Sequence, residues 1–472
     1  MKQTPHGSFA HIKESLIQYL ETQYKIANSV IFDERGKILR EGDKVAQVPF
    51  IEATPNFVAN NFLRDLEVRH ETIATGLSDL VQHGVAVDRH KIYTHQEEAL
   101  LASFGRQPNL LVATGTGSGK TEAFLLPILS KLINESRGWS PPDNTDLISR
   151  YDQRRETWLA SRRAENRPAA IRSIILYPMN ALVNDQLTRL RRILSLGESP
   201  NWQRSNLNGN LVHFGMYTSL TPLAGSWNEA WRREKVERFL AEIQRDWDNL
   251  PASYRELGTW PRPDSAEMLT RWDMQSYPPD ILVTNYSMLE YMLMRPVEST
   301  MFDQTREWLQ NDPSAHFTLV LDEAHTYSGA KGTEVAHLIR RLKERLGLSA
   351  SRKFQAIATT ASVPPTADNQ LKEFTSALFG EPEASWTLIR AGVAPSKPDT
   401  RDADRIALAA FSLFQRDFEL QSPRLAIQRL AGAYQIADID FSNGDEAALY
   451  SLIRDNPFIE WVRSKTARNA TP

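Results

Sequence analysis

Two short stretches hold the residue types that phosphate chemistry requires. The first, residues 110–129 (LLVATGTGSGKTEAFLLPIL), places three glycines and Lys120 between two apolar runs. Glycine costs backbone entropy inside a helix or strand, so a glycine cluster needs a compensating role. A glycine-rich turn can point successive backbone N–H groups into one concavity, and the helix that follows adds a positive field. The pattern predicts a nucleotide-binding loop in which Lys120 reaches the β- and γ-phosphates and Thr121 binds Mg²⁺.

This loop should join a strand over 109–113 to a helix over 121–132. The first position of the usual pattern G-x-x-x-x-G-K-[ST] is Thr114 instead of glycine. An ordinary strand-to-helix turn is the alternative, and the combination of Gly-Lys-Thr with both flanking elements leaves it little weight. The expected nucleotide-binding residues of the loop are Thr116, Gly117, Ser118, Gly119, Lys120 and Thr121.

The second stretch, residues 316–329 (HFTLVLDEAHTYSG), places carboxylates directly after an apolar run. Residues 317–321 read as a central parallel strand, and ligands of open α/β sheets bind outside the carboxyl ends of the strands. Asp322 is therefore expected to hold Mg²⁺ through its water shell, and Glu323 is the natural general base for the attacking water. A solvated turn is the alternative for the four residues that end at His325, and the loop upstream argues against it.

With these two motifs the chain resembles the first RecA-like lobe of a superfamily 2 DEAD/DEAH-box helicase. The resemblance implies ATP and Mg²⁺ as cofactors and Lys120, Asp322, Glu323 and His325 as catalytic residues. The sequence of residues 177–187 (YPMNALVNDQL) indicates a narrower group within this superfamily. It is similar to large bacterial helicases of DNA repair and anti-phage defence, such as the Druantia and DISARM helicases.

Residues 92–100 (IYTHQEEAL) resemble the glutamine motif of the same family. Gln96 can pair with the adenine edge because an amide carries both a donor and an acceptor. Tyr93 could stack on the base. By composition alone a single glutamine is a surface residue, and only the family position favours the adenine site.

Three further strand ends resemble family motifs. At the first, the resemblance implies that Pro178, Asn180 and Gln186 grip a nucleic-acid backbone. At the second, Thr284 and Asn285 resemble the phosphate-contacting motif of the lobe. Residues 354–365 (FQAIATTASVPP) end the third strand. There Thr360 and Ser362 stand where helicases carry Ser-Ala-Thr, which couples hydrolysis to strand movement.

Strand-like runs alternate with helical patterns, which predicts an α/β fold with helices on both faces of a parallel sheet. The resemblance makes this region, residues 88–380, a RecA-like P-loop NTPase lobe. Two insertions are expected, at 133–170 and 223–279. A mostly helical accessory domain should occupy residues 1–87. A C-terminal extension, residues 381–472, carries further helices and leads toward a second lobe.

Both insertions leave two interpretations open. Between Arg150 and Arg167 there are six arginines against three acids. These could form a phosphate-contacting arm or, more commonly, a solvated helix face. The second insertion holds five of the eleven tryptophans. These could stack on single-stranded bases or, as is more usual, build a small core.

Composition narrows the class of protein. The net charge of −3 means that any nucleic-acid surface must be local. The 472 residues include no cysteine, which excludes disulfides and cysteine-ligated zinc and fits a cytoplasmic location. No apolar run approaches the length of a membrane span, so no membrane partner is expected.

Helicases of this superfamily need a second RecA-like lobe, whose Q-x-x-G-R-x-x-R helix supplies an arginine finger worth about 10³–10⁵ in rate in related NTPases. No such pattern follows residue 365. We therefore expect a partner lobe in cis or in another chain, with the present chain as an N-terminal portion or a split subunit of weak activity.

The sequence thus indicates an ATP-dependent nucleic-acid helicase or translocase. The family wording favours DNA over RNA and a role in anti-phage defence or DNA repair. The alternative is an ATP-gated nucleic-acid-binding scaffold or switch without unwinding activity. The intact set of Lys120, Asp322 and Glu323 favours the motor.

Overall fold

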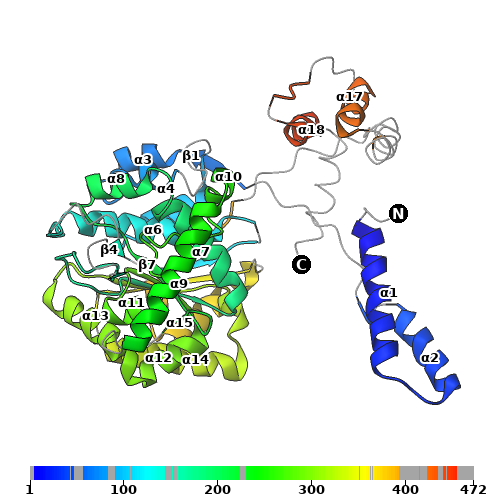
Figure 1. Ribbon diagram of the computed structural model, residues 1–472, viewed down its shortest axis with the longest axis horizontal. Helices are drawn as coiled ribbons and strands as arrows, with labels where there is room; N and C mark the ends of the chain where they lie inside the picture. The colour runs from blue at the N-terminus through cyan, green and yellow to red at the C-terminus, as the bar shows by residue number, and fades with distance from the viewer. Residues whose placement is uncertain are drawn as a thin grey trace. The chain divides into compact units, whose positions relative to one another are not determined.

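The chain contains two compact units. One spans Asn56–Ala394, and the other comprises Met1–Pro55 and Pro395–Pro472. The computed structural model (Figure 1) describes residues 5–42, 44–46, 57–82, 91–106, 108–115, 117–143, 151–152, 157–158, 160–223, 230–349, 351–361, 363, 365–392, 414, 422–433, 439–442 and 444–453.

The larger unit is built around a seven-stranded sheet in which every neighbouring pair of strands is parallel. Every residue of β3, β6, β9 and β10 is buried, as expected where helices cover both faces of a sheet. This arrangement confirms the predicted α/β fold with a parallel sheet. In spatial order the strands are β11 (Trp386–Arg390), β3 (Asn109–Ala113), β10 (Phe354–Thr360), β9 (Phe317–Leu321), β6 (Ser173–Tyr177), β8 (Ile281–Asn285) and β7 (Phe214–Tyr217).

Helices cover the two faces of the sheet and form two separate apolar cores with it (Figure 1). The first core includes residues of α3 (Leu63–Arg69), α4 (Leu77–Val81), α5 (Thr94–Ala102), α6 (Lys120–Ser136) and α7 (Asn180–Leu194), with α8 (Ser199–Asn206) beside them. The second includes residues of α11 (Arg271–Ser276), α12 (Tyr286–Met294), α13 (Ser299–Asn311), α14 (Gly329–Leu346) and α15 (Asp368–Phe379).

The smaller elements of this unit lie in its N-terminal segment and in the two insertions. Two short antiparallel pairs occur, β1 (Ala59–Asn61) with β2 (Ile92–Tyr93), and β4 (Tyr151–Asp152) with β5 (Thr157–Trp158). The second insertion contributes α9 (Ala230–Asn249) and α10 (Ala252–Arg255).

The described residues of the two terminal segments are largely helical. Near the N-terminus are α1 (Pro5–Gln23) and α2 (Ser29–Arg40), which Arg40 links through ion pairs of 2.6 Å to Glu14 and 2.8 Å to Glu21. Near the C-terminus α17 (Pro423–Ala433) and α18 (Asp445–Ile453) share a small apolar cluster.

The larger unit extends beyond the predicted 88–380 at both ends. Residues of α3 and α4 belong to the first core. Strand β11 pairs with β3 in register, with Trp386 opposite Asn109. Apolar burial and backbone pairing therefore join both segments to the lobe. Of the described helices, none is both long and apolar enough to cross a bilayer.

Candidate nucleotide site and nucleic-acid interface

The glycine-rich loop joins β3 to α6, as the sequence predicts. Gly117 and Gly119 have φ angles of 71° and 74°, the left-handed region that glycine adopts without a steric cost. A Cβ atom at Gly119 would lie 2.3 Å from Nε2 of Gln96. The left-handed turn therefore favours glycine at 119, and a Cβ atom there would also displace the end of the Gln96 side chain.

Two side chains of α5 hold the backbone of this loop. Nε2 of His95 lies 2.8 Å from the carbonyl oxygen of Ser118, and Nε2 of Gln96 donates to the carbonyl oxygen of Gly119 over 3.1 Å. The Gln96 side chain also accepts from the backbone N–H of Tyr93 at 2.9 Å. Burial lowers the pKa of His95, which keeps this buried ring neutral. The glutamine motif therefore supports the shape of the loop.

Helix α6 begins at Lys120, directly after the glycine-rich loop. Its N-cap residue is Gly119, which has no side chain to bond the first N–H groups of the helix. Uncapped N–H groups at the start of a 17-residue helix form a binding site for anions. Thr121 lies in the first turn and is partly exposed.

Lys120 and Glu323 meet across the site, although 203 positions separate them. Nζ of Lys120 donates to Oε1 of Glu323 over 2.8 Å, with the two side chains 12% and 25% exposed. The contact forms because β3 and β9 flank β10 and carry the loop and the acidic pair at their carboxyl ends. The phosphate-binding loop and the carboxylates thus share one site.

Asp322 is held by a residue that the sequence analysis did not single out, Thr359 of β10. Oγ1 of Thr359 donates to Oδ1 of Asp322 and accepts from the backbone N–H of Glu323 at 3.2 Å. Burial raises the pKa of Asp322, the hydrogen bond from Thr359 opposes that rise, and the charge of Glu323 adds to it. A divalent cation beside Asp322 would offset both the cost of burying its negative charge and its repulsion by Glu323, so the residues fit Mg²⁺.

His325 links the acidic pair to the end of β10. Its Nδ1 lies 3.3 Å from Oε2 of Glu323, 3.3 Å from Oγ1 of Thr360 and 3.4 Å from the backbone nitrogen of Ala361. Glu323 itself has a φ angle of 51°, which a residue with a side chain rarely adopts. Such backbone strain clusters at functional sites.

Two expected site residues, Thr116 and Ser362, lie outside the described part of the chain. Tyr93 is partly buried and stacks on His95, with ring centres 5.6 Å apart. Phe57 packs edge-on against Tyr93 at 5.5 Å. The structure thus adds Phe57 to the aromatic group beside the loop.

The expected nucleic-acid residues divide into an outer and an inner set. Asn180 follows β6, and Asn285 is the last residue of the adjacent strand β8. Nδ2 of Asn285 donates to Oδ1 of Asn180 over 2.6 Å. Pro178 lies beside them and is partly exposed. Gln186 and Thr284, in contrast, are buried, with relative exposures of 2% and 0%.

The two buried residues bond inside the protein. Oε1 of Gln186 accepts from the hydroxyl of Tyr177 at 2.8 Å, and Oγ1 of Thr284 donates to the carbonyl oxygen of Tyr217 at 2.5 Å. The expectation of a surface contact does not fit these positions. Gln186 lies on the face of α7 that packs on the sheet, which the helical spacing from Asn180 could have indicated.

Two arginines of the first insertion are buried, so they belong neither to a solvated face nor to an exposed arm. Arg162 and Arg167 are 1% and 4% exposed. Arg167 binds Asp280 through two bonds of 2.7 Å, and Arg172 donates to the same carboxylate at 2.9 Å. Burial alone would raise the pKa of Asp280, but the charges of the three arginines hold it well below its usual range. The arginines therefore anchor the insertion to the residue that precedes β8.

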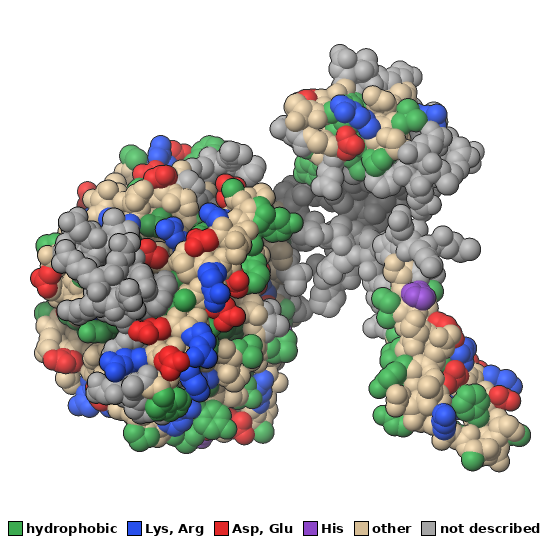
Figure 2. Space-filling model, viewed as in Figure 1, with side chains coloured by type: hydrophobic (Ala, Val, Ile, Leu, Met, Phe, Trp, Pro, Cys, Tyr) green, Lys and Arg blue, Asp and Glu red, His purple; other side chains and the backbone are tan. Residues whose placement is uncertain are grey.

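The second insertion divides its tryptophans between core and surface. Trp272 packs with Val236 and Leu240 in a small core, whereas Trp231 and Trp260 are exposed. Trp227 lies outside the described residues. Figure 2 shows basic and acidic side chains intermixed over α7 and α9, consistent with a mixed charged surface instead of a single basic stripe.

An ion pair joins the nucleotide helix to α7. Arg189 of α7 donates to Oε1 of Glu122 in the first turn of α6. The sequence does not reveal this contact, because 67 positions separate the two residues. The pair connects the loop to the helix that begins at Asn180.

Comparisons with known proteins agree with this geometry. Residues 93–213 match the family model for DEAD/DEAH box helicase. The chain is 35% identical over 481 residues to Druantia protein DruE of Escherichia coli (strain UMEA 4076-1), and the match spans 90% of this chain and 24% of that protein. The chain thus spans about a quarter of the length of the curated relative it matches.

Solved structures of the DUF1998 helicase MrfA are also similar. The complex with DNA and AMPPNP gives a TM-score of 0.40 at 18% identity, covering 89% of this chain and 43% of that chain. The complex with DNA gives a TM-score of 0.40 at 17% identity, covering 81% and 39%.

Proposed function

We propose that this chain, which carries a DEAD/DEAH box helicase domain, is the ATP-hydrolysing lobe of a DNA helicase or translocase. The observation that carries the proposal is the 2.8 Å contact between Lys120 and Glu323. It brings a phosphate-binding loop and a hydrolytic carboxylate to one place at the carboxyl edge of the sheet.

In the proposed mechanism the triphosphate lies against the uncapped N-terminus of α6, and Lys120 exchanges its bond to Glu323 for one to the phosphates. This exchange releases Glu323 to accept a proton from the attacking water. Mg²⁺, when bound, would neutralise developing charge on the phosphates, and Thr121 and Asp322 are the residues that would hold it.

Coupling to movement is proposed to run through His325. This ring contacts both Glu323 and Thr360, so a change in the bonding of Glu323 alters the packing at the end of β10. Thr360 and Ser362 keep their predicted role in coupling. Gln96 and Tyr93 keep theirs at the adenine, with Gln96 also fixing the loop.

The proposed nucleic-acid surface lies where β6 and β8 end. Asn180 and Asn285 are adjacent there, and α7 starts at Asn180 without a side-chain cap. Helix N-termini and amide side chains both bind phosphate oxygens, which position a strand without reading its sequence. Pro178 belongs to the same surface, while Gln186 and Thr284 support it from inside.

The finer parts of the proposal rest on the resemblance. The resemblance of residues 177–187 to helicases of DNA repair and anti-phage defence favours DNA over RNA. The identity to Druantia protein DruE supports a role in anti-phage defence. A second RecA-like lobe, in cis or from a partner chain, would supply the arginine finger. The absence of cysteine supports a cytoplasmic location.

ATP turnover of the chain, measured with and without single-stranded DNA or RNA, tests the proposal. We expect stimulation by DNA that disappears in Glu323→Gln and persists in Glu334→Gln, because Glu334 is an exposed carboxylate of α14 remote from the loop in sequence. Stimulation by RNA alone would refute the DNA assignment. Tight DNA binding without turnover, with the second lobe supplied, would favour the ATP-gated switch.

A further inference from the structure

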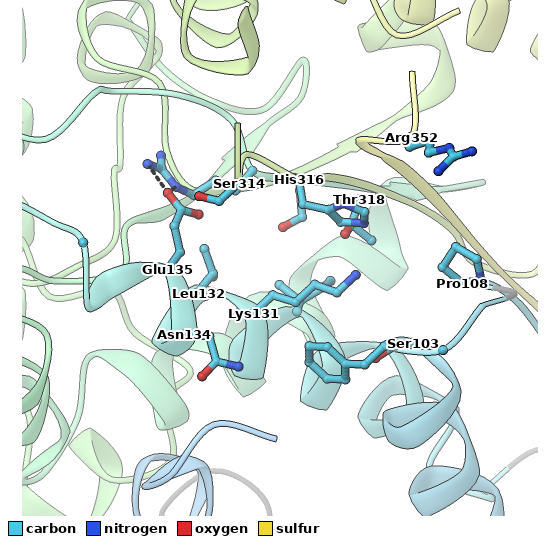
Figure 3. A pocket seen from close by; sticks show the side chains of 16 residues that line it. Ser103, Pro108, Lys131, Leu132, Asn134, Glu135, Ser314, His316, Thr318 and Arg352 are labelled. Atoms are coloured by element: carbon cyan, nitrogen blue, oxygen red, sulfur yellow. Dashed lines mark hydrogen bonds and ion pairs between the residues drawn. The ribbon is translucent and has the colours of Figure 1, made fainter. Parts of the chain in front are cut away.

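A cavity with charged and polar side chains in its wall lies at the edge of the sheet opposite the nucleotide site. Its volume is about 600 Å³. Its wall includes Pro108, Ser173, His316 and Arg352, which stand at or just before the amino ends of β3, β6, β9 and β10. Because these strands are parallel, their amino ends lie across the sheet from Lys120 and the acidic pair. Figure 3 shows Lys131 extending into this cavity between Ser103 and His316.

Three buried polar atoms on the wall have no hydrogen-bond partner within the part of the chain that the structure describes. They are Oδ1 of Asn134, Oγ of Ser173 and Nε2 of His316. Buried polar atoms are nearly always bonded, so each exception needs an explanation. All three atoms belong to residues that line one cavity, so they are candidates for hydrogen bonds to a polar occupant.

The charged groups of the wall leave an excess of positive charge. Glu135 is paired with Arg172 at 2.8 Å, so its charge is already compensated. Nζ of Lys131 donates to a neutral acceptor, Oε1 of Gln355, at 2.5 Å. Arg352 is exposed at the rim and makes no ion pair with any described residue.

The pKa values of the two titratable groups inside the cavity are both lowered by burial. Burial lowers the pKa of Lys131 to about 7. Burial and then the charge of Lys131 lower the pKa of His316 to about 3. A negative charge between these groups would favour the charged form of Lys131.

Part of the wall is apolar. Phe104, Ile128 and Leu132 line one side, and Nζ of Lys131 lies 5.7 Å from the centre of the Phe104 ring. Cavities of roughly 300–1,000 Å³ with apolar walls and a few convergent polar groups are typical of small-molecule sites.

We propose that this cavity binds a small organic oxyanion, either a phosphate ester or a carboxylate that also carries an apolar group. The acidic group lies among Lys131, His316 and Arg352, and the apolar group lies against Phe104 and Leu132. This site is separate from the nucleotide loop and does not depend on the proposed helicase function.

Labelling of Lys131 tests the site directly. The full chain is treated at pH 7 with an N-hydroxysuccinimide ester, and acylation of the peptide that contains Lys131 is followed by mass spectrometry. Phenyl phosphate and benzoate serve as the anionic probes, and phenol serves as the neutral control of matching shape. The experiment is repeated in Lys120→Ala, which removes binding at the nucleotide loop without touching this cavity.

Saturable protection of Lys131 by phenyl phosphate or benzoate, but not by phenol, supports the proposal, and the better probe assigns the phosphate or carboxylate class. In Arg352→Ala the apparent affinity should fall roughly 10-fold, because a charge-assisted hydrogen bond is lost at an exposed residue. Labelling rates that no probe changes, or equal protection by phenol, would overturn the proposal.

Calorimetry decides the case in which Lys131 does not react with the ester. Heat of binding from either anion that is lost in Lys131→Met supports the site. The absence of any heat, or heat that Lys131→Met retains, overturns it.

Discussion

Glu323→Gln should change nucleotide affinity and turnover in opposite directions. Without nucleotide, Nζ of Lys120 is bonded to the Glu323 carboxylate, so incoming phosphates compete with that carboxylate for the ammonium group. Glutamine keeps the size of the side chain and removes its charge. Lys120 is then free for the phosphates, while the general base for the attacking water is lost.

The size of the effect follows from the geometry. Two unit charges 2.8 Å apart attract with roughly 6 kcal/mol at an effective dielectric constant of ~20, most of which desolvation offsets. Hydrogen bonds to charged groups contribute about 1.5–3 kcal/mol net. The 25% exposure of Glu323 favours the lower value. We therefore expect the affinity for a non-hydrolysable ATP analogue to rise about 10-fold and turnover to fall about 10²–10⁴-fold.

Titration calorimetry with the analogue and Mg²⁺ measures the affinity. Removing any carboxylate near the loop also reduces repulsion of the phosphates, so Glu122→Gln serves as the matched control. Glu122 lies in the first turn of α6 but bonds Arg189 and not Lys120. If Glu323→Gln tightens binding no more than Glu122→Gln, the Lys120–Glu323 pair does not restrain the lysine and the reasoning fails.

Three further predictions concern the loop, the anchor and the nucleic-acid surface. Gly119→Ala should weaken analogue binding by at least about 10-fold in the same titration, because it strains a left-handed residue; Gly115→Ala, whose Cβ would meet no atom within 4 Å, should bind normally. Asp280→Asn should lower the free energy of unfolding by about 3–5 kcal/mol in urea denaturation, against about 0–1 kcal/mol for Asp303→Asn, which breaks a more exposed pair. Since the folded pKa of Asp280 is depressed, this stabilisation is present above about pH 4 and is lost as the pH falls further; a loss on raising the pH would contradict it. Asn180→Ala should weaken binding of single-stranded DNA by about 1 kcal/mol in fluorescence anisotropy and leave analogue binding unchanged; equal loss of both would indicate misfolding.

The sequence predicted the elements whose signal is local. The strand at 109–113 and the loop after it are contiguous in the chain, so spacing alone places Lys120 where the loop after a buried strand meets the next helix. The same holds for Asp322 after the strand at 317–321. The contact between the two motifs followed from the rule that parallel strands present their carboxyl ends at one edge.

Contacts between distant segments outside these two motifs were not predicted. Arg167 reads as one more charge in a basic run until the chain folds and places it on Asp280, 113 positions away. Thr359 likewise gains its role only because β10 lies beside β9. In the same way, the pairing of β11 with β3 depends on the completed sheet.

The anchor at Asp280 restricts how the first insertion can be re-engineered. Three arginines, Arg162, Arg167 and Arg172, now pair with the buried carboxylate of Asp280. A shortened or exchanged loop that omits Arg162 and Arg167 would leave this carboxylate with Arg172 alone of the three. A designer who trims this segment should therefore neutralise position 280 in the same step. Replacement loops that leave residues 160–172 unchanged would retain the ion pairs to Asp280, and such loops could vary in length and chemistry.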